Sequence, residues 1–204
     1  MNDAATAPAA SASTSDCKPM RADAVRNRAQ LIDAAGREFL ARGTEVPMEE
    51  IARAAGVGVG TLYRHFPQRL NLIEAVYRQE VENLCGGVAD LLATRPADEA
   101  LEEWMLQFIE HIGLKKGLVD ALRSSMDSES EVFDHVTAAL REAVTTLVQA
   151  AIDSGRIRSD LDPLDVLRAV SGFCLVSANY GWQERARRLV DIFMDGLRVG
   201  ARQH

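Results

Sequence analysis

The sequence predicts an all-α protein of about nine helices, in which a small three-helix domain precedes a larger helical domain. Along nearly every readable segment the apolar residues recur at steps of three and four, which is the period of an amphipathic helix. No segment shows the strict alternation expected of a half-buried strand. Hydrophobic residues make up 47% and charged residues 26% of the chain, so a core can form without disulfides or metal sites.

The chain begins with a segment rich in Ala, Ser and Thr, residues 1–20. This segment has neither the basic start nor the leucine-rich stretch of a signal peptide, and we expect a disordered tail. The first helix is predicted from Arg21 to Ala41, with Gly43 as its stop. Its buried face is predicted to hold Val25, Ile32, Ala35 and Phe39.

Residues 47–66 read PMEEIARAAGVGVGTLYRHF and predict two short helices. Pro47 suits a first-turn position, and Gly56 ends the first of the two. Two short helices joined by a tight turn that contains glycine form a helix-turn-helix. In DNA-binding proteins that use this motif, the second helix enters the major groove.

The second short helix has Leu62 and Phe66 four residues apart, which predicts that both face inward. Its other side chains then face outward or sideways. Hydroxyl, phenol, guanidinium and imidazole groups can donate hydrogen bonds to phosphate oxygens or to base edges. An apolar residue or a glycine at the helix start can touch a thymine methyl group or permit close backbone approach. The predicted DNA-contacting residues are Val59, Gly60, Thr61, Tyr63, Arg64, His65 and, at the start of the next helix, Arg69.

The distribution of charge matters because the net charge is −7, which is unusual for a nucleic-acid-binding protein. Residues 18–73 carry nine basic and six acidic side chains, whereas the remainder of the chain is acidic. A basic N-terminal region attracts phosphates, and an acidic remainder is repelled by DNA. The charge pattern is therefore compatible with DNA binding by the N-terminal region.

The remaining two thirds of the chain predict further helices. After Pro67 an apolar stripe runs from Leu70 to Leu91, and the pair Gly86 and Gly87 is expected to bend or end that helix. The other predicted helices are a short one over residues 117–126 and those that begin at Pro96, at the capping box of Ser128 and Glu131, at Asp162 and at Glu184.

Over roughly residues 24–78 the chain resembles the TetR family of bacterial regulators, through the string AAGVGVGTLYRHFPQRLNLIEAV and the preceding REFLARG. The resemblance implies that Val59 to Phe66 is the recognition helix. It also implies phosphate contacts by Thr61, Tyr63 and His65, with a cation supplied by Arg69.

The chain departs from the family pattern around this helix. Many relatives have a polar residue where this chain has Gly58, which predicts weaker capping of the helix. Val59 replaces a common polar or basic residue, so one base contact is expected to be apolar. Glu49 and Glu50 stand where some relatives use basic residues, and we assign no DNA contact to them.

The C-terminal region resembles the family in helix count and order. This implies a homodimer built on the last two helices, from Pro163 to Arg198, and a small-molecule cavity in each subunit. The run from Ala169 to Val176 is apolar almost all round, which favours burial against a second subunit over a core helix in a monomer. Aromatic and Met residues at helical spacing more often form ordinary core than a cavity lining. The candidates for the cavity are Trp104, Phe108, Met126 and Phe173.

The sequence thus divides into a tail (1–20), a helix-turn-helix domain (21–68) and an effector-binding and dimerisation domain (69–204). We expect a cytoplasmic, ligand-responsive repressor that leaves a palindromic operator when a small molecule binds. The alternative is a small-molecule-binding or adaptor protein whose helix-turn-helix no longer binds DNA. No spacing of catalytic residues, of glycines or of the three cysteines indicates an enzyme, a cofactor or a metal site. No apolar run is long enough to cross a membrane.

Overall fold

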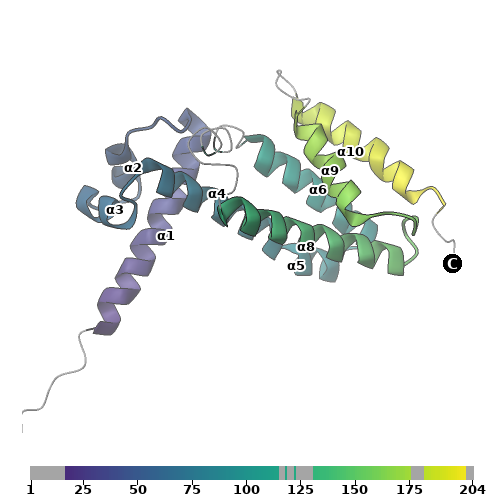
Figure 1. Cartoon of the computed structure of the whole chain (residues 1–204), viewed down its shortest axis with the longest axis horizontal. Helices are drawn as coiled ribbons and strands as arrows, with labels where there is room; N and C mark the ends of the chain where they lie inside the picture. The colour runs from purple at the N-terminus through teal and green to yellow at the C-terminus, as the bar shows by residue number, and fades with distance from the viewer. Residues whose placement is uncertain (1–16, 115–117, 119–121, 123–130, 176–181, 201–204) are drawn as a thin grey trace, which may run out of the picture.

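The computed structural model describes residues 17–114, 118, 122, 131–175 and 182–200. Throughout these residues the regular secondary structure is α-helical, which confirms the predicted all-α class. Figure 1 shows two short helices against one long helix at one end of the molecule and a group of helices packed side by side at the other, with α4 between them. The N-terminal helices are α1 (Cys17–Arg42), α2 (Met48–Ala54), α3 (Val59–His65) and α4 (Arg69–Gly86).

Two glycines end the first two helices as predicted. Gly43 has a φ of 86° after α1, and its N–H donates to the carbonyl of Phe39 at 2.9 Å. Gly56 has a φ of 66° after α2. A left-handed backbone of this kind strains residues that carry a Cβ atom, so glycine is the residue that suits both positions.

The buried face of α1 was predicted correctly except at its N-terminal end. Ile32, Ala35 and Phe39 are buried, but Val25 is 71% exposed. The prediction for Val25 is therefore wrong. Val25 has the correct helical period, but it belongs to the N-terminal half of α1, whose first turns project beyond the other helices in Figure 1. The helix also begins at Cys17, inside the segment that we predicted as a tail.

The apolar stripe predicted from Leu70 to Leu91 is divided between α4, whose buried residues run from Leu72 to Leu84, and the helix that follows it. The α4 helix ends at Gly86, and α5 (Val88–Thr94) follows directly after Gly87. The glycine pair therefore ends the helix rather than only bending it.

At the centre of the larger region lies α6, which packs against α4, α5, α8, α9 and α10. Its aromatic residues Trp104 and Phe108 are buried. None of the described helices is long and apolar enough to span a membrane. The helices of this region are α6 (Ala97–Leu114), α8 (Glu131–Asp153), α9 (Pro163–Leu175) and α10 (Trp182–Arg198).

The predicted cap at Asp162 is confirmed, because its Oδ1 accepts a hydrogen bond from the backbone N–H of Leu164 at 2.8 Å. The predicted helix over residues 117–126 falls largely outside the described residues, as does the capping serine, Ser128. Within that stretch Leu118 and Leu122 are described, and both are buried.

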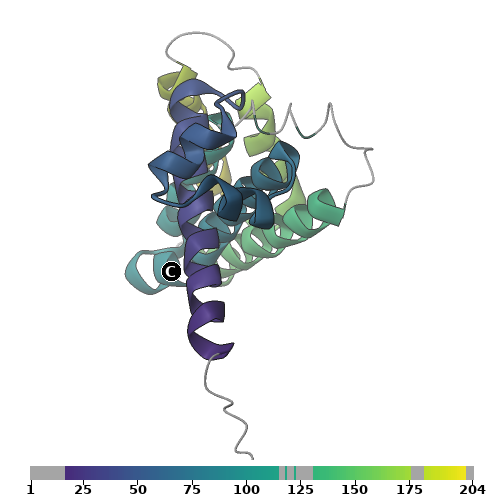
Figure 2. The ribbon, with the colours of Figure 1, turned by 90° about the vertical axis from the view of Figure 1, so that its left-hand side faces the viewer.

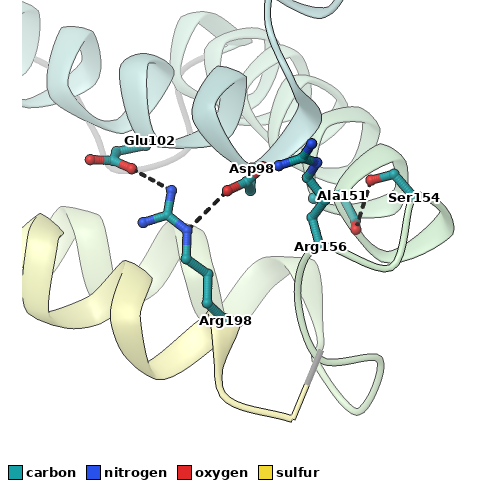
Figure 3. A network of polar contacts seen from close by, with 6 residues as sticks. All are labelled: Asp98, Glu102, Ala151, Ser154, Arg156 and Arg198. Atoms are coloured by element: carbon teal, nitrogen blue, oxygen red, sulfur yellow. Dashed lines mark hydrogen bonds and ion pairs between the residues drawn. The ribbon is translucent and has the colours of Figure 1, made fainter. Parts of the chain in front are cut away.

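A group of charged residues links the start of α6 to the end of α10 (Figure 3). Nε of Arg198 donates to Oδ2 of Asp98 at 2.9 Å, and its Nη2 donates to Oε2 of Glu102 at 2.7 Å. Arg156 lies on the other side of Asp98, with 3.3 Å between Nη1 and Oδ1. Burial disfavours the charged form of Arg198, but the hydrogen bonds to Glu102 and Asp98 outweigh it, so its pKa is raised. We call these four residues the α6–α10 clamp.

Candidate nucleic-acid interface

The two short helices predicted from residues 47–66 are α2 and α3. They meet through apolar residues: Ile51, Ala52 and Leu62 are fully buried, and Phe66 is only 2% exposed. The predicted inward orientation of Leu62 and Phe66 is therefore confirmed. Figure 2 looks onto this end of the molecule, where the two helices lie against α1.

The start of α3 is held by backbone groups alone. The carbonyl of Gly58 accepts hydrogen bonds from the N–H groups of Thr61 (2.9 Å) and Leu62 (3.1 Å), and no side chain caps the helix. The lack of a capping side chain was predicted from Gly58. Val59 is 40% exposed, and a Cβ atom at Gly60 would meet nothing within 4 Å. The first turn of α3 thus offers a small, open surface.

The predicted contact residues further along α3 all reach the surface. Tyr63 is 41% exposed, Arg64 is exposed, and Thr61 and His65 are half-buried. Hydrogen-bond donors of four kinds therefore lie on one short helix whose opposite side is anchored in the core. That arrangement fits the contacts that a duplex requires.

The hydroxyl of Tyr63 has a partner that the sequence did not indicate. Its Oη donates to Oε1 of Glu49, in the first turn of α2, at 3.0 Å. The pKa of Glu49 is lowered by its own backbone N–H and by this hydrogen bond. The same hydrogen bond raises the pKa of Tyr63. Both pKa shifts favour a neutral phenol and an ionised carboxylate, which are the protonation states that this hydrogen bond requires.

Arg69 is half-buried at the start of α4, and it contacts the loop between α1 and α2. Its Nη1 donates to the carbonyl of Thr44 at 2.7 Å and also to the carbonyl of Val46. The sequence predicted a cation placed beside a phosphate. The structure adds that this guanidinium holds the loop that precedes α2.

A hollow of about 400 Å³ lies beside the C-terminal end of α3. The guanidinium carbon of Arg28, on α1, lies 5.4 Å from the centre of the Phe66 ring, a distance typical of a cation–π contact. The sequence did not indicate Arg28 as a neighbour of Phe66, because no local pattern shows which residue of α1 packs against the end of α3. The hollow is lined by Arg28, His65, Phe66, Pro67, Asn71, Glu74, Ala75 and Arg78.

The residues predicted to line an effector cavity are brought together only in part. Trp104 and Phe108 are buried on α6 with their ring centres 5.5 Å apart. Phe173 is half-buried on α9 and packs edge-on against Phe193 of α10 at 5.8 Å. Met126 lies outside the described residues. Nε1 of Trp104 is buried without a hydrogen-bond partner among the described residues.

No group of three or more His, Cys, Asp or Glu side chains in the described part of the chain could hold a metal ion. The described surface around α3 carries hydrogen-bond donors and guanidinium groups, with the carboxylates of Glu49 and Glu74 beside them. Donors and guanidinium groups recognise phosphates and base edges.

Two family models match the chain. The model described as bacterial regulatory proteins, tetR family, matches residues 31–76. The model described as transcriptional regulator SbtR-like, C-terminal domain, matches residues 96–199. The first match includes α2 and α3, and the second includes α6, α8, α9 and α10.

Individual proteins extend this similarity. The crystal structure of the TetR transcriptional regulator SCO0520 from Streptomyces coelicolor is 43% identical, with a TM-score of 0.74, over 84% of this chain and 98% of that one. The transcriptional activator FasR from Mycolicibacterium smegmatis is 42% identical over 89 residues, which is only 41% of that activator's length. The transcriptional repressor KstR2 from Rhodococcus jostii is 26% identical over 142 residues, 66% of this chain and 70% of the repressor.

Proposed function

Because the chain belongs to the TetR family of helix-turn-helix, DNA-binding transcriptional regulators, which are not enzymes, we propose that it acts as a homodimeric repressor. A small molecule bound in the C-terminal region releases it from a palindromic operator. The observation that carries the proposal is the anchoring of α3 by Leu62 and Phe66, which exposes its opposite face to a duplex.

We assign the DNA contacts to the accessible residues of α3. Thr61, Tyr63 and His65 donate to backbone phosphates, and Arg64 reaches base edges. Val59 and Gly60, at the open first turn, allow close approach to the groove floor. Arg69 contributes positive charge near the flanking phosphate while it holds the preceding loop.

Dimerisation through α9 and α10 is supported by apolar side chains that remain exposed or half-exposed in one subunit. Ile192 is 69% exposed, and Leu167, Phe173, Leu189 and Phe193 are only half-buried. A second copy of the same two helices would cover them, as closed symmetric dimers do. The two recognition helices of the dimer would enter successive major grooves about 34 Å apart.

Effector binding in the C-terminal region is supported by Trp104. A buried indole N–H without a partner costs about 1–3 kcal/mol, and a ligand that carries an acceptor would recover that energy. Repression rather than activation is supported by the match to the repressor KstR2, which spans more of this chain than the match to the activator FasR.

The experiment is a fluorescence anisotropy titration of the protein with a duplex from the region upstream of its own gene. We expect tight binding by a dimer, and a weaker complex with a random duplex of the same length. The Thr61→Ala and Tyr63→Phe variants should bind the upstream duplex more weakly, whereas Thr145→Ala, on the exposed surface of α8, should bind as the unmodified protein does. Failure to bind either duplex would favour the alternative, an adaptor whose helix-turn-helix no longer binds DNA.

A further inference from the structure

The Tyr63 hydroxyl donates its only hydrogen to the carboxylate of Glu49. A phenol has a single O–H group, and in this structure it points to Oε1 of Glu49 at 3.0 Å. Both residues are exposed. A phosphate that accepts the Tyr63 hydroxyl must therefore displace this carboxylate and then lie beside it.

The carboxylate of Glu49 is ionised at the pH at which the protein works. Its pKa is lowered by its own backbone N–H, by the Tyr63 hydroxyl and by the positive charge of Arg69. In the described structure Glu49 forms no ion pair with Arg69, whose Nη1 donates to two backbone carbonyls of the loop. A negative charge thus stands next to the proposed phosphate contact.

We propose that Glu49 is a positioning residue that fixes the Tyr63 side chain and, through its charge, weakens binding to DNA of every sequence. This inference rests on the proposed phosphate contact of Tyr63. Two like charges about 5 Å apart at a water-like dielectric constant change a binding constant by about fourfold. The effect is independent of sequence because phosphates carry no base information.

The neighbouring Glu50 provides a charge-matched comparison. Its carboxylate forms an ion pair with Arg42 at the end of α1 and is half-buried. It makes no contact with Tyr63 in the described structure. Removal of the Glu50 charge changes the net charge of the protein by the same amount but leaves the Tyr63 hydroxyl with its partner.

The test compares Glu49→Gln with Glu50→Gln on the upstream duplex and on a random duplex at one salt concentration. We expect Glu49→Gln to bind both duplexes about fourfold more tightly, and Glu50→Gln to gain less than about twofold. In a Tyr63→Phe background the gain from Glu49→Gln should fall below about twofold, because the phosphate is no longer drawn to that position. A gain in affinity cannot arise from damage to the fold.

Three results would overturn the inference: unchanged affinity of Glu49→Gln, weaker binding by it, or an equal gain with and without the Tyr63 hydroxyl. The last would mean that the Glu49 charge acts independently of the Tyr63 hydroxyl. Absence of binding by the unmodified protein to both duplexes would instead contradict the proposed function, so the two failures are distinguishable.

Discussion

The DNA-reading end of the molecule and its C-terminal region place their polar contacts differently. Around α3, Arg69 holds the α1–α2 loop and Tyr63 pairs with Glu49, both within or beside the surface that we propose contacts DNA. In the C-terminal region, the α6–α10 clamp is centred on the buried Asp98, and its four residues are remote from α3 in the chain. Substitutions that remove the buried anchor of α3 or the loop contacts of Arg69 should therefore change stability and DNA binding together, whereas those in the clamp should change stability alone.

The largest effect is expected from Leu62→Ala. Leu62 is fully buried beneath α3, and removal of a side chain of this kind costs about 3–4 kcal/mol. We expect loss of that stability in urea denaturation and at least a tenfold loss of DNA affinity. Leu62→Met, which conserves volume, should cost less than about 1.5 kcal/mol. Full DNA affinity in Leu62→Ala would show that α3 needs no anchor.

Next in size is Asp98→Ala, which leaves Arg198 and Arg156 without their shared partner. Because Arg198 is partly exposed, we expect a loss of about 2 kcal/mol, below the range for a fully buried pair. Urea denaturation measures this loss, and DNA affinity should not change. Asp165→Ala, which removes an exposed ion pair with Arg168, should stay within about 0.5 kcal/mol of the unmodified protein. A matching fall in DNA affinity for Asp98→Ala would contradict the separation of the two regions.

Arg69 combines a stabilising contact to the α1–α2 loop with a proposed contribution to DNA binding. Arg69→Ala loses both the loop contacts and the charge, and we expect a loss of about 1–2 kcal/mol of stability together with weaker DNA binding and a shallower salt dependence. Arg69→Lys keeps the charge but cannot reproduce the guanidinium geometry. It should therefore recover most of the salt dependence but little of the stability. Recovery of both by Lys would mean that the contacts to Thr44 and Val46 stabilise nothing.

Tyr63→Phe should affect binding almost alone. The hydrogen bond to Glu49 is at the surface, where water replaces a lost partner, so its loss should leave thermal stability nearly unchanged. Loss of a phosphate contact should weaken binding to the upstream duplex about fivefold. Anisotropy titration measures the second effect and thermal denaturation the first. Equal DNA affinity of Tyr63→Phe and the unmodified protein would show that the Tyr63 hydroxyl makes no contact with DNA.

The smallest effect is expected at Cys85. Burial and, to a lesser degree, the nearby Glu142 raise the pKa of this thiol to about 11, so little reactive thiolate exists near neutral pH. We expect Cys85→Ala to leave peroxide-induced release of DNA unchanged. A clear difference in release between the two proteins would instead identify Cys85 as a redox-sensitive residue.

Periodicity in the sequence predicted what depends on neighbours along one helix. Apolar spacing identified the buried pair Leu62 and Phe66, and residue type identified the helix stops at Gly43 and Gly56 and the cap at Asp162. These features depend on residues at most four positions apart, and such local patterns are visible without knowledge of the fold.

Contacts between distant segments were not predictable in the same way. Arg69 reaches a loop more than twenty residues earlier, and Arg28 lies over Phe66 although they belong to different helices. Val25 has the spacing of a buried residue but is exposed near the N-terminal end of α1. A sequence pattern predicts which face of a helix is apolar, but not where along the helix its partners begin and end.

Contact between α3 and DNA is tested most directly by hydrogen–deuterium exchange with and without the upstream duplex. We expect exchange to slow across residues 58–66, which contain α3, and to stay unchanged across residues 136–153 of α8. This comparison reads the binding surface without any substitution. Unchanged exchange at residues 58–66 in a protein that is saturated with DNA would contradict the assignment of α3 as the helix that contacts the duplex.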